Sequence, residues 1–402
     1  MGNGWCARVS GPLAPYADGY RRELQRLGYT AASTELKVSQ MSHLSRWLDG
    51  NGLRVGDVAT GTVQAFLTDW GLGRRRTPTL RAMRPLLEWL FVQGMIGTDP
   101  AAPREALDEL LADYRQWMVT DRALAARTVG RYEATARRFL AGRAQSAEAT
   151  GAEGLTGQAV TAFLLAEAAR GLARGSVQGR VAELRSLLRF LHEKGLTQSA
   201  LTESVPPVPG WKDTAVPPRL AAAAVRTLVD SCDRTTPTGT RDFAMLLLLA
   251  RLGLRAAEVA RLELDDVNWR AGEFVVRGKA RREDRMPLPT DVGEALSAYL
   301  VAARPRGVAS RTVFLTVAAP PRPLWPTTVS QMVWRQCRRA GLPPVRAHRL
   351  RHALATDLLD HGVALPKIGQ VLRQRDLATT ASYAKVDYTA LRELALPWPA
   401  VP

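Results

Sequence analysis

Hydrophobic residues recur with a helical period through the first part of the chain. The residues that repeat this way are Met41, Leu44 and Leu48, followed further on by Leu80, Met83, Leu87 and Leu90. A spacing of three and four positions predicts amphipathic helices, and Thr60 is suited to cap the helix that begins near it. Pro100 and Pro103 then interrupt the pattern. We therefore expect a helical module over residues 1–103.

The next block, residues 104–204, repeats this plan. Three segments correspond in order: Trp47–Leu48 with Phe139–Leu140, Val63–Leu67 with Val160–Leu164, and Leu86–Leu90 with Leu187–Leu191. A glycine follows the last segment in each block, Gly94 and Gly195. This order favours tandem duplication of one four-helix module. The alternative is two unrelated amphipathic bundles that share general leucine and aromatic patterns.

A different pattern begins after the Pro-rich segment 205–218, which is typical of a stiff linker. Phe243–Leu252 is an apolar run that predicts a helix ending at Gly253. Glu273–Arg277 and Asp284–Leu288 flank a basic turn and predict a β-hairpin, whereas Asp265–Asn268 predicts a turn. The expected fold is mainly α-helical, with a small antiparallel sheet in a C-terminal domain over residues 219–402.

Composition indicates a polyanionic partner. The chain has 402 residues, 46% of them hydrophobic, and a net charge of +17. That length allows two or three domains, and such an excess of arginine favours nucleic acid as the partner. A basic protein from an Arg- and Ala-rich genome would have a similar composition, so charge alone leaves both explanations open.

Composition also argues against several other classes. Cys6, Cys232 and Cys337 are too few and too scattered for a disulfide framework or a zinc site. The sequence contains no apolar run as long as a membrane span and no signal-peptide pattern, so we expect a cytoplasmic protein. It also lacks a phosphate-binding glycine loop and a carboxylate cluster for Mg²⁺, so we expect neither cofactor nor metal.

The candidate chemistry is concentrated in two boxes and one tyrosine. Gly253-Leu254-Arg255 is followed by Glu258, and a second box reads His348-Arg349-Leu350-Arg351-His352. Tyr383 comes later, just after a Thr-Thr pair. In their order and residue types, these elements resemble the tyrosine recombinases, the phage-integrase family.

The resemblance implies a domain plan. Both helical modules are similar to the core-binding domain that precedes the catalytic domain in this family, lies across DNA and closes a clamp. The second fits better, because Thr128, Tyr132, Ala136 and Phe139 share one helix face. Two copies depart from the commonest layout, so the first could read arm sites, extend the clamp or contact another protein.

The resemblance also assigns catalytic roles. Tyr383 is the expected nucleophile, which stores the cut strand as a 3′-phosphotyrosine and leaves a 5′-hydroxyl. Arg255 and Arg351 match the charge that develops on the phosphate. Lys279, on the hairpin, is the expected general acid, and His348 either helps to deprotonate the tyrosine or binds the phosphate.

Each of these assignments has a structural alternative. Arg255 could be a lone arginine whose head reaches solvent, and Lys279 a solvated residue of a hairpin tip beside Ala280, where the family often has a second glycine. We expect Glu258 to support the fold rather than react. His352 is expected to point elsewhere than His348 and to be structural.

Gln374 is a departure from the family pattern. Aligning Leu372-Arg373-Gln374 with the family's Leu-Gly-His segment puts glutamine where a second histidine or a tryptophan usually stands. Glutamine can donate a hydrogen bond to a phosphate oxygen but cannot carry a proton. Arg373 or Arg375 could compensate.

Further arginines are candidates for DNA contact, since phosphate contacts give affinity and register without reading sequence. The candidates are Arg74, Arg75, Arg76, Arg174, Arg180, Arg281 and Arg282. A solvated helix end is an equally good explanation for any single one.

The sequence thus predicts a metal-independent, site-specific recombinase that cuts and rejoins double-stranded DNA as the integrase or transposase of a mobile element. The expected assembly is a homotetramer on paired sites, with sister recombinases as possible further partners, and the tail after Tyr383 packs either on a neighbouring protomer or in cis. Two rivals are a type IB topoisomerase and an accessory DNA-binding subunit with weakened catalysis at Gln374.

Overall fold

The structure is a computed structural model of the chain. It describes residues 8–71, 79–97, 106–144, 148–171, 174–197, 200–205, 220–278 and 283–374. Contacts divide the chain into two compact units, one made of Gln93–Thr214 with Val58–Thr62 and the other of the remaining residues. The expected boundaries near residue 103 and at the 205–218 linker fall almost wholly outside the described residues and stay predictions.

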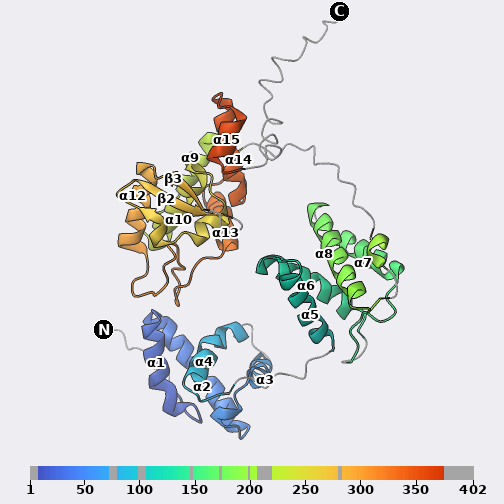
Figure 1. The fold of residues 1–402 in the computed structure, drawn as a ribbon. Helices are drawn as coiled ribbons and strands as arrows, with labels where there is room; N and C mark the ends of the chain where they lie inside the picture. The colour runs from blue at the N-terminus through green and yellow to red at the C-terminus, as the bar shows by residue number, and fades with distance from the viewer. Residues whose placement is uncertain are drawn as a thin grey trace, which may run out of the picture. The chain divides into compact units, whose positions relative to one another are not determined.

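The first module is helical, as its hydrophobic period predicts (Figure 1). Its helices are η1 (Ala14–Tyr16), α1 (Ala17–Arg26), α2 (Ala31–Gly50), η2 (Val55–Asp57), α3 (Thr60–Gly71) and α4 (Leu80–Val92). Met41, Leu44 and Leu48 are fully buried, which confirms the pattern in α2. In α4 the buried leucine of the central turn is Leu86 and not Leu87, and the buried face consists of Met83, Leu86 and Leu90.

The second module has its own hydrophobic core. Its helices are α5 (Ala106–Thr120), α6 (Ala126–Ala141), α7 (Gly157–Ala169), α8 (Arg174–Glu193) and η3 (Leu201–Ser204). Tyr114, Trp117 and Phe190 meet in the core, with ring centroids 5.1–6.0 Å apart. The Thr156 hydroxyl caps α7 by accepting a hydrogen bond from the Ala159 N–H.

Corresponding positions in the two modules make the same contacts. Trp47 meets Phe66 edge-to-face at 5.9 Å, and the equivalent Phe139 meets Phe163 edge-to-face at 5.0 Å.

A second pair of contacts also matches. Tyr20 lies 5.5 Å from Trp89, while Tyr114 lies 5.1 Å from Phe190, which stands at the position equivalent to Trp89. Gly94 and Gly195 both have a left-handed φ, of 69° and 72°. These matches support the prediction that one module was duplicated.

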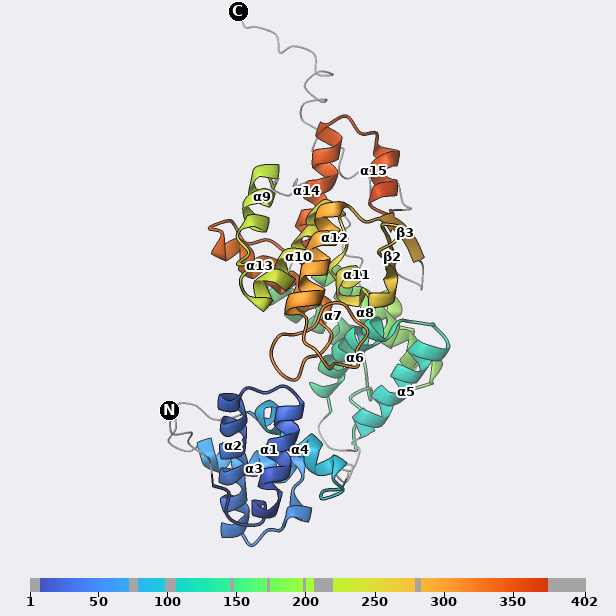
Figure 2. The same ribbon diagram turned by 90° about the vertical axis from the view of Figure 1, so that its left-hand side faces the viewer.

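The C-terminal part is organised around α10 (Pro237–Arg251), whose residues from Ala244 to Ala250 are all buried. Figure 2 shows α9, α12, α13 and α14 around it, and each of them packs against α10. A helix that is apolar on every side requires this position. The helices of this part are α9 (Ala222–Asp230), α11 (Ala256–Arg261), η4 (Leu264–Asp266), α12 (Thr290–Ala298), η6 (Tyr299–Ala303), α13 (Pro326–Arg339), α14 (Ala347–Asp360) and α15 (Leu365–Val371).

A small antiparallel sheet packs against this helical core. Its order is β1 (Val267–Asn268), β2 (Glu273–Arg277) and β3 (Glu283–Pro287). Phe274 and Val276 turn one face of β2 into the core. Asp265–Asn268, which we expected to form a turn, consists of the end of the 3₁₀ helix η4 followed by the edge strand β1. A strand of two residues is too short to be recognised from the sequence.

The described residues confirm the expected fold class, mainly α-helical with a small antiparallel sheet. None of the described helices is both long and apolar enough to cross a membrane.

Candidate active site

The site begins at the turn that ends α10. Gly253 has a φ of 59°, in the left-handed region that favours glycine. A Cβ there would lie 2.7 Å from Leu372 Cδ2 and 3.0 Å from Leu354 Cδ2. The absence of a side chain at Gly253 lets the chain reverse closely enough for Arg255 to stand at the N-cap of α11 directly after the turn.

Arg255 is held by Glu258, one helical turn further along. The Arg255 N–H donates to Glu258 Oε2 at 2.8 Å, and its Nη1 donates to Glu258 Oε1 at 2.7 Å. The Glu258 side chain is 5% exposed, whereas that of Arg255 is 45% exposed. Glu258 therefore fixes a guanidinium that still faces solvent, as its expected supporting role requires.

Neighbouring groups stabilise the ionised form of the Glu258 carboxyl group. Burial acts to raise its pKa, but the hydrogen bond from the Arg255 backbone, the charge of Arg373 and the Arg255 guanidinium together outweigh burial, and the pKa is lowered. The carboxylate therefore stays ionised.

Arg351 is 1% exposed and lies beneath this turn. Its Nη1 donates to the Gly253 carbonyl at 2.6 Å, and its Nη2 donates to the Leu372 carbonyl. The guanidinium thus joins α14 both to the turn before Arg255 and to the end of α15.

His348 and His352 form a pair on α14. Their ring centroids lie 4.4 Å apart, edge-to-face. The expectation that His352 points elsewhere is wrong, because residues four apart on a helix share a face.

Both histidines have a lowered pKa. For His348 the causes are partial burial and then the charges of Arg351, Arg255 and Arg349. For His352 burial comes first, followed by His348 and the arginines, and the pKa falls to about 4. Both imidazoles are therefore neutral at pH 7.

Gln374 lies just beyond α15, half-buried, and its backbone N–H donates to the Gly369 carbonyl at 2.8 Å. The neighbouring Arg373 side chain is 5% exposed and donates to Glu258 Oε2 at 2.9 Å. Arg373 is thus turned inward, where it contacts Glu258 and is not presented to solvent as a replacement phosphate ligand.

The structure brings together the candidate catalytic residues that it describes. Arg255, His348 and Arg351 form one cluster, with Gln374 at the end of the helix that Arg351 holds. The remaining candidates lie outside the described residues: Lys279, Arg281, Arg282, Tyr383, Arg375, Arg74, Arg75 and Arg76, together with the Arg174 side chain.

Comparison with known proteins assigns this arrangement to a family. Residues 218–390 match the model of the phage integrase family. A putative integrase/recombinase of Sinorhizobium fredii, y4rA, is 38% identical over 97% of this chain and 95% of its own length. The chain belongs to the phage integrase family.

More distant relatives agree with this assignment. Tyrosine recombinase XerD of Listeria innocua is 27% identical over 72% of this chain and 97% of its own length. Among solved structures, XerH site-specific recombinase bound to a palindromic difH substrate covers 98% of this chain and 99% of its own, with a TM-score of 0.52 and 14% identity. At that identity the likeness concerns the fold.

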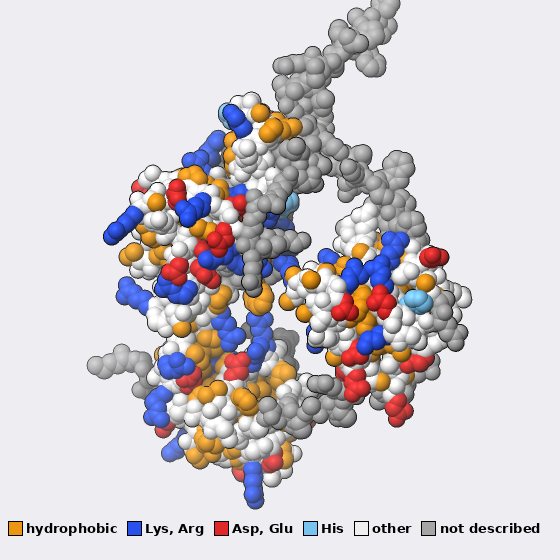
Figure 3. All heavy atoms as spheres, in the orientation of Figure 1, with side chains coloured by type: hydrophobic (Ala, Val, Ile, Leu, Met, Phe, Trp, Pro, Cys, Tyr) orange, Lys and Arg blue, Asp and Glu red, His pale blue; other side chains and the backbone are white. Residues whose placement is uncertain are grey.

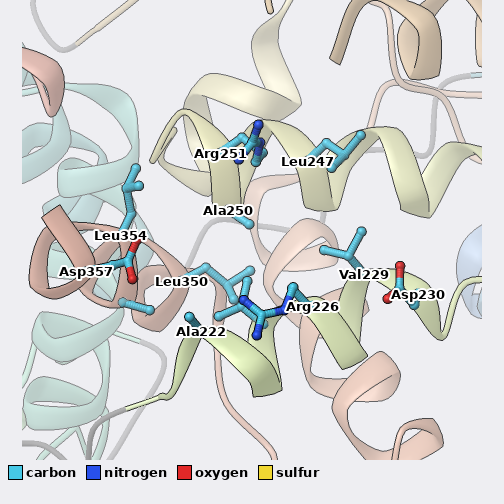
Figure 4. A pocket seen from close by; sticks show the side chains of 12 residues that line it. Ala222, Arg226, Val229, Asp230, Leu247, Ala250, Arg251, Leu350, Leu354 and Asp357 are labelled. Atoms are coloured by element: carbon cyan, nitrogen blue, oxygen red, sulfur yellow. The ribbon is translucent and has the colours of Figure 1, made fainter. Parts of the chain in front are cut away.

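Within this phage integrase chain, α14 has two distinct faces. One carries His348 and His352, and the other lines a pocket of about 390 Å³ between α9, α10 and α14 (Figure 4). Leu350 and Leu354 lie on the pocket side. Of the candidate catalytic residues that the structure describes, none lines this pocket.

The second module holds a charge network that the sequence did not reveal. Glu167 and Glu183 are buried, and four arginines surround them: Arg131, Arg138, Arg170 and Arg180. Arg180 pairs with both carboxylates, at 3.2 Å and 2.7 Å, and is largely buried. It is therefore a member of this network, and not the solvated helix end that was one alternative.

The other three arginines of the network keep much of their side chains exposed, 59% for Arg131, 38% for Arg138 and 57% for Arg170. Four positive charges against two carboxylates leave an excess on this surface. Figure 3 shows Lys and Arg side chains gathered on one side of the second module. The spacing of Arg131 and Arg138, two helical turns apart, was the signal available in the sequence.

No group of three or more His, Cys, Asp or Glu residues among the described residues could hold a metal ion. The candidate site is instead a cluster of cations around one carboxylate, which suits an anion such as a phosphodiester.

The Gly253 turn gives a stability prediction. Gly253→Ala should lower the free energy of unfolding by about 1–2 kcal/mol for the left-handed φ, plus about 1–3 kcal/mol for overpacking against Leu372 and Leu354. Gly272→Ala is the matched control, because its φ is 63° and nothing lies within 4 Å of the added Cβ. Urea titration of both proteins measures the difference, and equal losses would contradict the packing argument.

The histidine pair predicts a pH dependence. The pKa of His352 is about 4 when folded against 6.5 unfolded, so below pH 6.5 the unfolded state binds more protons. Stability should therefore fall as the pH drops from 6.5 towards 4. His352→Gln should lose less Tm than the wild type over this range. An identical fall in both would show that other groups cause it.

Proposed function

We propose that this chain is a site-specific recombinase that cuts and rejoins DNA strands through a covalent phosphotyrosine on Tyr383. The observation that carries the proposal is the cluster at the Gly253 turn. Arg255 is exposed but held in place by Glu258. His348 is neutral, and the charge of Arg255 contributes to lowering its pKa. Arg351 lies beneath the Gly253 turn. A fixed arginine that faces solvent, with a second arginine beneath it, supplies positive charge where a phosphodiester transition state gathers negative charge.

The proposed reaction conserves the energy of the broken bond. The Tyr383 oxygen attacks the scissile phosphorus, and the bond from phosphorus to the 5′ oxygen breaks. The strand remains joined to the protein as a 3′-phosphotyrosine, and the departing 5′ oxygen takes a proton. Attack by a 5′-hydroxyl on the phosphotyrosine reverses these steps and joins a strand.

The proton transfers are assigned to two residues. His348 has a lowered pKa, so its imidazole is neutral at pH 7 and can accept the Tyr383 proton. Lys279 supplies the proton to the leaving oxygen. The roles of Lys279 and Tyr383 rest on the family resemblance, since both lie outside the described residues.

The arginines have separate tasks in this proposal. Arg255 binds a non-bridging phosphate oxygen directly, because its side chain is 45% exposed. Arg351 fixes the Arg255 turn and adds positive charge beneath it, and it reaches the phosphate only if the bound state uncovers its guanidinium. Gln374 donates a neutral hydrogen bond at the end of α15.

Duplex DNA is the proposed partner. The net charge of +17 and the exposed arginines of the second module support it. We propose that the two helical modules extend one DNA clamp and that several copies assemble on paired sites of a mobile element. A lambda integrase dimer bound to a COC′ core site, with a TM-score of 0.52, has the related fold.

The direct test is covalent trapping. Full-length protein is incubated in EDTA with nicked duplexes that tile the DNA flanking its gene, after a gel shift has identified the bound ones. Wild type should form an SDS-resistant protein–DNA adduct, and Tyr383→Phe should bind the same DNA without forming it. An adduct with both proteins would exclude Tyr383 as the nucleophile.

One rival is favoured by a specific residue. Gln374 cannot carry charge, so an accessory subunit that binds DNA without cutting it remains the second candidate. That rival predicts binding without adduct in the wild type and recovery of cleavage in Gln374→His. A topoisomerase would instead relax plasmids that lack any specific site.

The charge network of the second module predicts a salt effect. Replacing Arg131 and Arg138 with alanine should weaken DNA binding and reduce the slope of log K against log salt by about 1 for each phosphate that the variant no longer binds. Arg115→Ala is the control, because Arg115 is 53% exposed but balanced by its own carboxylate, Glu133. Binding titrations over a range of NaCl measure the slopes. Equal slopes in both variants would remove this surface from the interface.

A further inference from the structure

Arg373 occupies a backbone position that favours glycine. It follows the last turn of α15 with a φ of 53°. The Arg373 N–H donates to the Gln370 carbonyl at 2.9 Å, and the Gln374 N–H donates to the Gly369 carbonyl at 2.8 Å. This pair of bonds is the helix-ending motif whose left-handed residue is usually glycine. An arginine at this position strains the backbone, so we expect its side chain to have a structural or functional role.

The side chain of Arg373 is turned into the protein. It is 5% exposed, although arginine is among the residues least often buried. Its Nη1 contacts the Met286 sulfur on β3, and its Nη2 donates to Glu258 Oε2 at 2.9 Å. The guanidinium therefore joins the end of α15 to the carboxylate that holds Arg255.

Glu258 is shared between the two arginines. Its Oε2 accepts from Arg373 and from the Arg255 backbone, while its Oε1 accepts from the Arg255 guanidinium. Within the buried part of the site, Arg373 balances the charge of Glu258. The charge of the exposed Arg255 is then available to an incoming anion instead of being cancelled by the carboxylate.

We propose that Arg373 is a positioning residue of the recombinase, which acts through Glu258 to keep Arg255 aimed at the scissile phosphate. This role rests on the proposed function of the site. Without Arg373 the buried carboxylate has Arg255 as its sole cationic partner in this network, and it draws that guanidinium away from the phosphate. Misplacement of a catalytic group by about 1 Å costs about 100-fold in rate.

The test compares Arg373→Gly and Arg373→Lys with wild type in single-turnover adduct formation on the bound nicked duplex. Glycine suits the left-handed backbone, so the helix end is preserved while the guanidinium is removed. Arg373→Gly should slow adduct formation about 10- to 100-fold without changing the Kd for DNA. Arg373→Lys keeps the charge and should retain more of the rate.

Chemical rescue separates positioning from a merely structural role. Added guanidinium chloride should restore part of the Arg373→Gly rate when compared with NaCl at equal ionic strength. Arg251→Gln is the matched control, because Arg251 is exposed in the same domain and pairs with Asp291 at 3.0 Å. It should keep the wild-type rate and show no rescue. A wild-type rate in Arg373→Gly, or parallel losses of rate and DNA affinity, would overturn the proposal.

A measurement without DNA decides the same point independently of the proposed function. Hydrogen exchange of the Arg255 backbone amide reports its bond to Glu258, and it should speed up in Arg373→Gly but not in Arg251→Gln. Unchanged exchange in Arg373→Gly would overturn the positioning role even if the wild type cleaves DNA. Failure of the wild type to form an adduct, with exchange altered as expected, would count against the proposed function alone.

Discussion

The site depends on one buried guanidinium. Arg351 is among the largest fully buried side chains of the described residues, and it donates to the carbonyls of Gly253 and Leu372. A buried charge is tolerated only when it is well hydrogen-bonded, so these carbonyls and Arg351 constrain one another. Three segments far apart in sequence, the α10–α11 turn, α14 and the end of α15, are thereby fixed at one place. Arg255 owes its position to that constraint, because it follows the Gly253 turn directly.

The site around Arg351 contains several arginines and few carboxylates to balance their charge. Glu258 is buried and ionised, and it serves both Arg255 and Arg373. Burial first, and then the positive charge of the neighbouring arginines, lowers the pKa of His348, so this histidine is neutral at pH 7 and can take a proton. The second module follows the same rule, since its two buried glutamates hold four arginines in place. In both regions, buried carboxylates orient arginines whose exposed parts are available to a polyanion.

The sequence predicted the framework because its signals are local. Helical periods, the Gly253-Leu254-Arg255 box and the His348/Arg351 spacing each follow from backbone geometry over a few residues. The same reasoning failed where tertiary contacts decide. Leu86 rather than Leu87 is buried in α4, and Arg180 joins carboxylates from two helices. The inward turn of Arg373 could not be predicted either, since an arginine at a helix end ordinarily reaches for solvent.

The central claim is that the Gly253 turn, supported by Arg351, places Arg255 and His348 at the phosphate that is cut. The most direct measurement is an experimental structure of Tyr383→Phe bound to a duplex that the wild type cleaves. We expect the scissile phosphate within about 3 Å of both the Arg255 guanidinium and the His348 ring, with the Arg351 bond to the Gly253 carbonyl retained. A scissile phosphate held elsewhere, with Arg255 contacting Glu258 alone, would contradict this claim.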